Sequence, residues 1–295
     1  MRIAITGSSG MVGSALRPRL EAAGHDIVRL RHGDSSNPNV EWSPANRWVR
    51  EGILEGVDVV LHLAGASIGD GRWSDSYKQE LRSSRIDGAT LLVDTIRAMS
   101  DRPAAFVTSS AVGFYGDRGE ERLTEDATRG SGFLADLVVD WEAAAQPAEG
   151  LGLRVAMVRS GIVPRSMLPA LITPFKFGLG GKLGSGKQYF PWVGLEDLVR
   201  IYAHAVTGDV SGPLNAVAPE EATNSNFTKD LGKAIHRPTL FPLPGFALKL
   251  IMGGEKAQET GLVSQRVLPQ RLVDGGWQFS QPTLAKALPD ELAAL

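Results

Sequence analysis

Three glycines directly after the first apolar run of the chain have the spacing of a loop that holds a phosphate-bearing ligand. Gly7, Gly10 and Gly13 follow the segment RIAIT at residues 2–6 and open a stretch of helical apolar period. Gly7 permits a tight turn, Gly10 lets a pyrophosphate approach the backbone at the positive end of a helix dipole, and Gly13 lets the helix pack closely on the sheet. Because strand, loop and helix occur in this order, we predict dinucleotide binding rather than a structural turn.

The residues after the second apolar run indicate which dinucleotide binds. An acidic side chain there would bind the ribose 2′-hydroxyl of NAD, whereas a basic one would accept the 2′-phosphate of NADP. The sequence reads VRLRHG, with Arg31 and His32 where the acid is expected and Asp34 slightly later. We therefore expect NADP rather than NAD. The alternative interpretation is that Arg31 is only a solvated charge at a strand end.

These residues need a parallel sheet to bring them together. Unbroken apolar runs, as expected of strands buried on both faces, occur at residues 2–6, 27–30, 57–63, 104–108 and 154–158. Segments with helical spacing of apolar residues lie between them, at 11–23, 75–98 and 133–148. This alternation predicts an α/β fold, a Rossmann-type doubly wound parallel sheet with right-handed crossovers.

The character of the chain changes after residue 163. Several prolines follow, and then the glycine-rich segment GLGGKLGSGKQ at 178–188. We predict a dinucleotide-binding Rossmann domain over residues 1–163. Residues 164–295 would form mostly a smaller C-terminal substrate region, with some segments returning to the first domain.

Composition excludes several classes of partner. The net charge is -2 and no block of five or more Lys or Arg residues occurs, so we expect a small-molecule substrate and no nucleic acid. No apolar run is long enough to span a membrane, and the chain starts directly with a strand-like segment, so we expect no membrane association and a cytoplasmic location. The chain has no cysteine, and its five histidines lack paired ligand spacing, so no metal site is expected. The sequence is compatible with a homodimer.

Further motifs resemble the extended short-chain dehydrogenase/reductase family. These motifs read HLAGASI, RWSDSYKQELRSSRI, SSAVGFYGDRG, WEAAA, LGGKLGSGKQYFPWV and GWQFSQPTLAKAL. They are similar to an atypical branch known as nucleoside-diphosphate-sugar epimerases or, in older naming, as cell-division-inhibitor-like proteins. The resemblance spans nearly the whole chain and implies a nicotinamide cofactor together with a small C-terminal region.

The residue pattern and the resemblance together predict a set of cofactor contacts. The expected contacts are Gly7, Ser8, Ser9, Gly10, Met11 and Val12 in the first loop, Arg31 and His32 after the second strand, Leu63, Ala64 and Gly65 beside the adenosine and ribose, Arg85, and Thr108, Ser109, Arg159, Gly161 and Val163 toward the nicotinamide.

The resemblance also implies where reaction chemistry would occur. In similar enzymes a serine or threonine after the fourth strand polarises the substrate, and Ser110 fills that position. The usual acid/base is a tyrosine with a lysine four residues later, whose charge lowers the phenol pKa. No tyrosine of this chain has a lysine at that spacing. If Glu142 matches the glutamate that commonly follows this lysine, Leu134 and Val138 occupy the tyrosine and lysine positions.

Two interpretations of the missing pair stay open. In the first, an NADP-dependent oxidoreductase or epimerase acts on a small carbonyl or sugar-nucleotide-like substrate. Its proton would come from solvent or from Tyr115, which we expect at the mouth of the cleft, five residues after Ser110. In the second, the protein is a non-catalytic NADP-binding regulator or redox sensor. An enzyme needs an open polar space beside the nicotinamide, whereas a sensor can fill that space with apolar side chains.

The glycine-rich segment at 178–188 favours the enzyme, because its backbone amides and lysines could cradle a polar substrate. A flexible lid or linker is the alternative. The expected substrate-contacting residues are Trp73, Lys187, Gln188 and Trp192.

Overall fold

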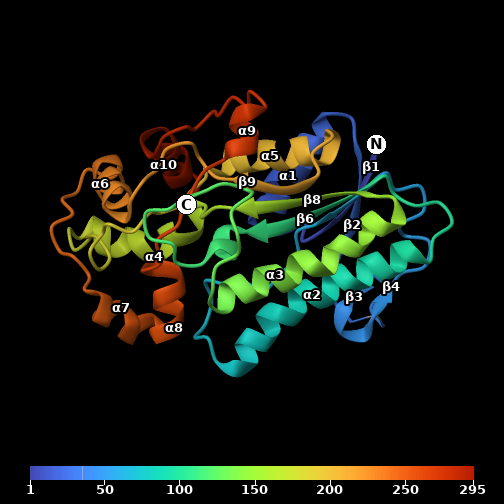
Figure 1. The fold of residues 1–295 in the computed structure, drawn as a ribbon, viewed down its shortest axis with the longest axis horizontal. Coiled ribbons are helices and arrows are strands. Elements are labelled where there is room, and N and C mark those ends of the chain that lie inside the picture. Colours follow the sequence, from blue (N-terminus) through green and yellow to red (C-terminus); the bar gives the residue numbers. More distant parts are fainter. Residues whose placement is uncertain (35) are drawn as a thin grey trace.

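A computed structural model of the protein describes residues 1–34 and 36–295, and its central element is a six-stranded sheet (Figure 1). The strands are β1 (Arg2–Thr6), β2 (Asp26–Leu30), β5 (Val59–His62), β6 (Ala105–Ala111), β8 (Arg154–Ser160) and β9 (Gly212–Ala216). Their order is β2-β1-β5-β6-β8-β9, and every neighbouring pair is parallel. The predicted α/β fold with a doubly wound parallel sheet is confirmed.

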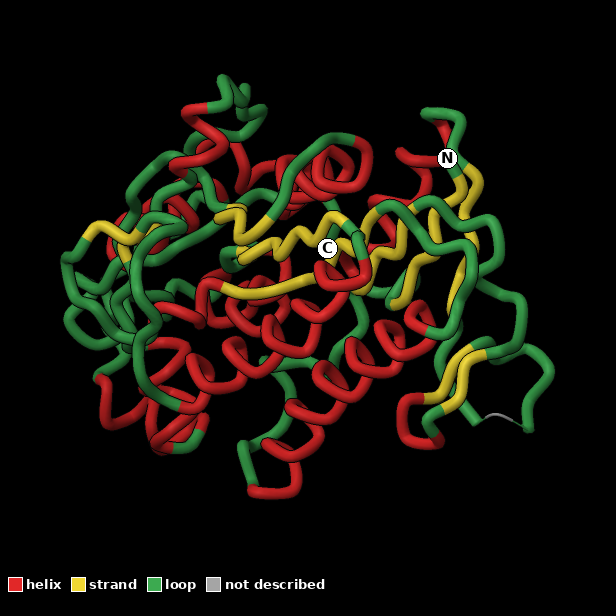
Figure 2. Tube along the Cα trace, turned by 45° about the vertical axis from the view of Figure 1, so that its right-hand side comes forward, coloured by secondary structure: helices red, strands yellow, loops and turns green. Residues whose placement is uncertain are grey.

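The direction of winding reverses between β1 and β5. The chain leaves β1 toward β2 on one side and resumes with β5 on the other. Crevices outside the carboxyl ends of strands at such a reversal are where open α/β sheets bind ligands. Beyond β2, His32 makes a parallel bridge to Trp42 at the start of a small antiparallel pair, β3 (Trp42–Ser43) and β4 (Trp48–Val49), seen at the edge of the molecule in Figure 2.

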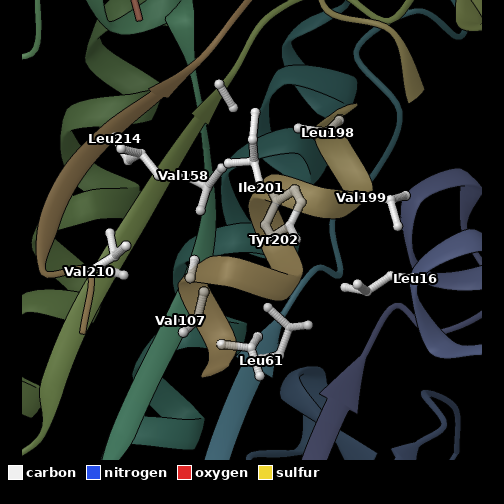
Figure 3. Close-up of a cluster of buried hydrophobic side chains, with 14 of the residues drawn as sticks. Leu16, Leu61, Val107, Val158, Leu198, Val199, Ile201, Tyr202, Val210 and Leu214 are labelled. Carbon is white, nitrogen blue, oxygen red and sulfur yellow. The ribbon is translucent and has the colours of Figure 1, made fainter. Parts of the chain in front are cut away.

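Two helical layers cover the sheet (Figure 1). Helices α1 (Met11–Ala22) and α5 (Leu195–Thr207) lie on one face, and α2 (Asp75–Arg97) and α3 (Phe133–Ala145) lie on the other. Because strand residues alternate between the two faces, Ile3 and Ile5 join one core and Ala4 the other. Figure 3 shows the first core, where Ile201 and Tyr202 of α5 are grouped with buried side chains of the sheet.

The C-terminal region forms a smaller core beside the sheet. Its principal elements are α4 (Pro164–Lys176), α6 (Asn224–Ala234), α7 (Gly245–Met252), α8 (Gly254–Lys256), the π-helical turn η4 (Ala257–Gly261) and α10 (Leu284–Ala293). The remaining short elements are η1 (Pro44–Asn46), η2 (Val112–Tyr115), β7 (Arg122–Leu123), η3 (Gln146–Leu151), β10 (Arg266–Val267) and α9 (Gln270–Asp274). Although α5 and β9 follow residue 163, they belong to the sheet and its first core. The boundary at residue 163 stays a prediction.

The last residue of β5, His62, is a histidine buried in the interior of the protein. His62 is fully buried, with its Nδ1 2.8 Å from the hydroxyl of Thr6 and its ring edge-on to Trp42. The Thr6 hydroxyl oxygen also accepts from the amides of Leu63 and Ala64. We therefore infer that the Thr6 hydroxyl donates its own proton to His62 Nδ1, which accepts the hydrogen bond. Burial lowers the pKa of His62 to about 4.

This burial predicts an acid-sensitive contribution to stability. Since the folded pKa of about 4 lies below the ordinary value of 6.5, stability is complete above pH 6.5 and falls as the pH drops toward 4. Between neutral pH and about pH 5, His62 should remove roughly 2 kcal/mol from the free energy of unfolding. Urea titrations followed by circular dichroism measure this loss. It should be absent in His62→Asn and retained in a control, His236→Asn, which changes an exposed histidine at positive φ where asparagine is tolerated. An unchanged pH slope in His62→Asn contradicts the assignment.

Candidate functional site

The loop after β1 has the geometry of a phosphate-binding turn. Gly7 has φ +66°, and a Cβ there would lie 2.7 Å from the carbonyl carbon of Leu63, while a Cβ at Gly13 would lie 2.3 Å from the oxygen of Gly7. At Gly10 the nearest atom would be 3.4 Å away. Helix α1 begins at Met11 without a side-chain cap and without an acid in its first turn. Packing therefore requires Gly7 and Gly13, whereas Gly10 and the first helical amides face open space that suits an anion.

Basic side chains at β2 are arranged differently from the expectation. Arg31 donates from Nε (3.0 Å) and from a terminal nitrogen (2.6 Å) to the carboxylate of Glu41, which is only 4% exposed. That carboxylate neutralises much of the charge expected to bind a 2′-phosphate. His32 lies edge-on to Trp42. Arg29, which the sequence reasoning missed, donates to the Ser8 hydroxyl at 3.1 Å and makes no ion pair within the described part of the chain.

A second cation lies beside the segment after β5. Arg85 is 8% exposed and donates to the carbonyls of Ala66 (2.8 Å) and Leu81 (3.1 Å), and its guanidinium lies against Gly65. Burial lowers its pKa to about 10, so the side chain stays charged at neutral pH. Among the described residues no carboxylate pairs with it. A buried cation without a counter-ion fits a site for an anionic group.

A buried network connects the carboxyl ends of three strands. The Ser110 hydroxyl donates to Glu142 at 2.5 Å, and both oxygens of that carboxylate accept from Arg159 at 2.8 Å. Arg159 also donates to the Tyr115 hydroxyl (3.0 Å), which in turn donates to the side chain of Asn215 (2.7 Å). Helix α3 and the ends of β6, β8 and β9 are therefore held together by one chain of hydrogen bonds.

The expected position of Tyr115 at the mouth of the cleft is wrong. Its ring is 0% exposed, and burial raises the pKa of its hydroxyl, which makes proton release harder. Ser110 is 3% exposed and its hydroxyl is engaged by Glu142. Because β6 continues to Ala111, Thr108 lies inside the sheet and is fully buried. The sequence indicates polar residues near a strand end but not which of them turn inward.

Some of the other expected contacts are buried inside the protein, and others are exposed. Trp192 and Gln188 are not open to a substrate: Trp192 is 1% exposed in the C-terminal core, and the Gln188 amide donates to the carbonyls of Leu183 and Gly261. Val163 is also buried. The expected residues that keep partial or full exposure are Ser9, Met11, Val12, Leu63, Ala64, Gly65, Trp73, Ser109, Gly161 and Lys187.

A cavity of about 200 Å³ lies at the start of α3. Its lining includes Leu134, the residue at the expected tyrosine position. The other lining residues are Gly113, Gly116, Asp117, Ser131, Gly132, Ala135, Gln258, Glu259, Val263 and Gln265. The lining thus has two carboxylates and two amides, but no Lys, Arg or His. The space is partly open and its accessible lining is mainly apolar, with single polar groups from these carboxylates and amides and from Ser131.

Part of the polar lining of this cavity comes from the C-terminal region. Glu259 of η4 accepts from the amides of Phe133 (2.8 Å) and Leu134 (2.7 Å) and so caps α3. Lys256, three residues earlier, donates to the carbonyls of Gly69 (2.6 Å) and Gly71 (2.8 Å). Sequence reasoning missed both residues, because a cap that comes from more than a hundred residues away leaves no local pattern.

The fold and this site define a Rossmann-type protein of the extended short-chain dehydrogenase/reductase class. A model of the NAD dependent epimerase/dehydratase family matches residues 3–217, and a domain of unknown function, DUF1731, matches residues 243–291. The chain belongs to the NAD dependent epimerase/dehydratase family. The predicted family resemblance is confirmed.

Similar proteins share nearly the whole chain. An epimerase family protein of Mycobacterium bovis is 40% identical over 292 residues, covering 97% of this chain and 96% of its own. The crystal structure of human epimerase family protein SDR39U1 with NADPH has a TM-score of 0.88 and 32% identity and covers 100% of both chains. The structure of a nucleoside-diphosphate sugar epimerase from Corynebacterium glutamicum has a TM-score of 0.78 and 34% identity, and this chain covers 58% of it.

No helix among residues 1–34 and 36–295 has both the length and the apolar character that crossing a bilayer demands. Over the same residues, no group of three or more His, Cys, Asp or Glu side chains is arranged to hold a metal ion.

The buried ion pair predicts a large loss of stability when one charge is removed. Glu142→Gln leaves the Arg159 guanidinium buried without its counter-ion, which should cost about 3–5 kcal/mol in the free energy of unfolding. The matched control is Asp140→Asn on the same helix, which removes a partly exposed pair with Arg82 and should cost less than about 1 kcal/mol. Urea unfolding followed by circular dichroism compares the two variants. Equal losses would show that the buried pair is not the stronger constraint.

Proposed function

We propose that the protein transfers a hydride between NADP and a small carbonyl or hydroxyl compound, as a reductase or as an epimerase that regenerates its cofactor. The observation that carries this proposal is the partly open cavity beside Leu134, whose lining brings Asp117, Glu259 and Ser131 together. A protein that only binds the cofactor has no need of such a space at the helix that carries the acid/base pair in similar enzymes. The NADPH in the structure of the human relative supports the choice of cofactor.

The cofactor site is proposed from the open backbone at Gly10 and from the basic side chains in and after β2. The pyrophosphate would lie against Gly10 and the first amides of α1. Arg29 would join Arg31 and His32 around the 2′-phosphate, and it is the more available cation because Glu41 engages Arg31. The remaining expected contacts stay part of this proposal. When bound, NADPH supplies the hydride, and the protein supplies position and electrostatics.

The cavity favours a small substrate that carries no negative charge. Its volume of about 200 Å³ is below the usual range for ligand pockets, which is roughly 300–1,000 Å³. Asp117 and Glu259 would repel a diphosphate, and the lining has no cation to offset that repulsion. We therefore favour a small carbonyl compound over a sugar-nucleotide-like substrate.

The proton would come from a group that reaches this cavity. Ser131 and Gln258 bring hydrogen-bond donors to the lining and would bind the substrate oxygen, and water in the open cavity would provide the proton. Tyr115 and Ser110 are proposed as positioning residues, because both belong to the network that holds α3 on the sheet.

One observation favours the second candidate function, a non-catalytic NADP-binding regulator. Val138, at the expected lysine position, is 2% exposed and lies close to Gly113, with 3.7 Å between its methyl group and an ideal Cβ there. The helix that carries the acid/base pair in similar enzymes therefore presents apolar side chains to the segment after β6. A measurement of substrate turnover would distinguish the enzyme from the regulator.

Cofactor binding should depend on the open side of Gly10. Gly10 has φ -71° and no close neighbour, so Gly10→Ala should change the free energy of unfolding by no more than about 0.5 kcal/mol. Its methyl group would occupy space proposed for the pyrophosphate, so NADPH affinity should fall by about tenfold or more. Fluorescence titration measures this change, and Gly150→Ala, an open glycine in η3, is the matched control. Equal affinities in the two variants would contradict the proposed pyrophosphate position.

Substrate choice should follow the charge of the cavity. We expect loss of NADPH absorbance with small uncharged aldehydes or ketones and little with keto acids or nucleotide sugars. Asp117 accepts backbone amides through Oδ1, so Asp117→Asn keeps the acceptor while removing the charge, and it should raise kcat/KM for keto acids relative to neutral ketones. Preferred turnover of nucleotide sugars would overturn the substrate class. Tight NADPH binding with neither oxidation nor epimerised products would favour the regulator.

A further inference from the structure

Exposed apolar side chains concentrate in one part of the C-terminal region. Seven large apolar residues there are between 59% and 77% exposed. This group, called the C-terminal apolar surface below, consists of Phe177, Leu179, Leu240, Phe241, Phe246, Leu250 and Ile251. Large exposed apolar patches indicate contact with another molecule or with a membrane.

The segments that carry these residues lie side by side. Arg237 donates to the carbonyl of Lys176 (2.9 Å), and the amide of Leu243 donates to the carbonyl of Lys182 (2.9 Å). The chain after α6 therefore runs along the chain after α4 and leads directly into α7. These segments form the left-hand end of the molecule in Figure 1. The seven side chains thus belong to one continuous region rather than to scattered positions.

Helix α7 has apolar side chains on both its buried and its exposed side. Leu248 is 5% exposed and packs close to Gly261, while Phe246 and Leu250 are each 77% exposed. Lys249 is exposed between them. Exposed aromatic and aliphatic side chains beside a lysine are the residue types that enter the headgroup boundary of a membrane.

The segments that carry the C-terminal apolar surface are rich in cations. Residues 171–187 and 231–254 contain no Asp or Glu, although Asp230 and Glu255 flank the second segment. Their cations are Lys176, Lys182, Lys187, Lys233, Arg237 and Lys249, of which Lys233 is paired with Asp230 at 2.8 Å. The chain as a whole has a net charge of -2, so this concentration of positive charge is local. A partner with a negatively charged surface complements it.

We propose that the C-terminal apolar surface binds the protein peripherally to anionic lipid bilayers. The apolar side chains would enter the headgroup boundary, and the five cations other than Lys233 would meet the lipid phosphates. A second copy on a two-fold axis would oppose cation to cation, which disfavours self-association. The expectation of no membrane association rested on the absence of spanning segments, and a peripheral surface needs none.

Vesicle flotation tests this proposal on the full chain. The protein is mixed with vesicles of phosphatidylcholine alone or of phosphatidylcholine with phosphatidylglycerol. We expect flotation with the anionic vesicles, reduced by added salt. The double variant Phe246→Ser with Leu250→Ser should reduce partitioning by about tenfold or more. Val273→Ser, which changes a 51% exposed apolar residue of α9 outside the surface, is the matched control and should float like the unaltered protein.

The control measurements separate binding from folding. Both variants should keep the circular dichroism spectrum and NADPH affinity of the unaltered protein, because the changed side chains are exposed and lie outside the proposed cofactor site. Failure to float with anionic vesicles overturns the proposal, and so does equal flotation of the double variant. Dimerisation without lipid that the double variant abolishes would identify a second copy as the occupant and likewise overturn it.

Discussion

The buried pair of Arg159 and Glu142 is the constraint on which the carboxyl edge of the sheet depends. Removing two charges from water costs several kcal/mol per ion, and the cost is offset only when geometry and further hydrogen bonds are complete. Here the carboxylate accepts twice from the guanidinium and once from Ser110, while the guanidinium also donates to Tyr115. Helix α3 is therefore fixed on β6 and β8 at one register, and the position of its first turn, where the cavity lies, follows from that register.

This use of strand-end polar residues explains how the site differs from the pattern that the sequence resembles. Tyr115 and Ser110 turn toward the ion pair and stabilise the fold, so their polar groups are not available at the surface of the cleft. With Leu134 at the cavity, the polar character comes instead from η4 and from the segments before α3. The polar groups of the cavity thus come from segments other than α3.

Local patterns predicted the fold well, because the apolar spacing of buried parallel strands and of amphipathic helices is visible within short runs of consecutive residues. The roles of Gly7 and Gly13 were also predictable, since strand, turn and helix follow one another directly. The inward direction of Tyr115 was not predictable, because it depends on whether a partner such as Asn215, a hundred residues later, is within reach. The pairing of Arg31 with Glu41 was missed for a related reason. The segment between these residues is irregular, so its sequence has no helical or strand spacing that would indicate that the two side chains are close.

The contacts of Lys256 and Glu259 connect the end of the chain to its first half. Glu259 caps a helix that begins 126 residues earlier, and Lys256 gathers carbonyls that precede it by 185 to 187 residues. Contacts of such separation form slowly, and during synthesis they must wait until the later segment has left the ribosome. The strands of the first half of the chain can therefore pair early during synthesis. The side of the cavity that η4 forms is added only near the end of translation. A chain released before that point would hold the glycine-rich loop after β1 but lack one side of the cavity at α3.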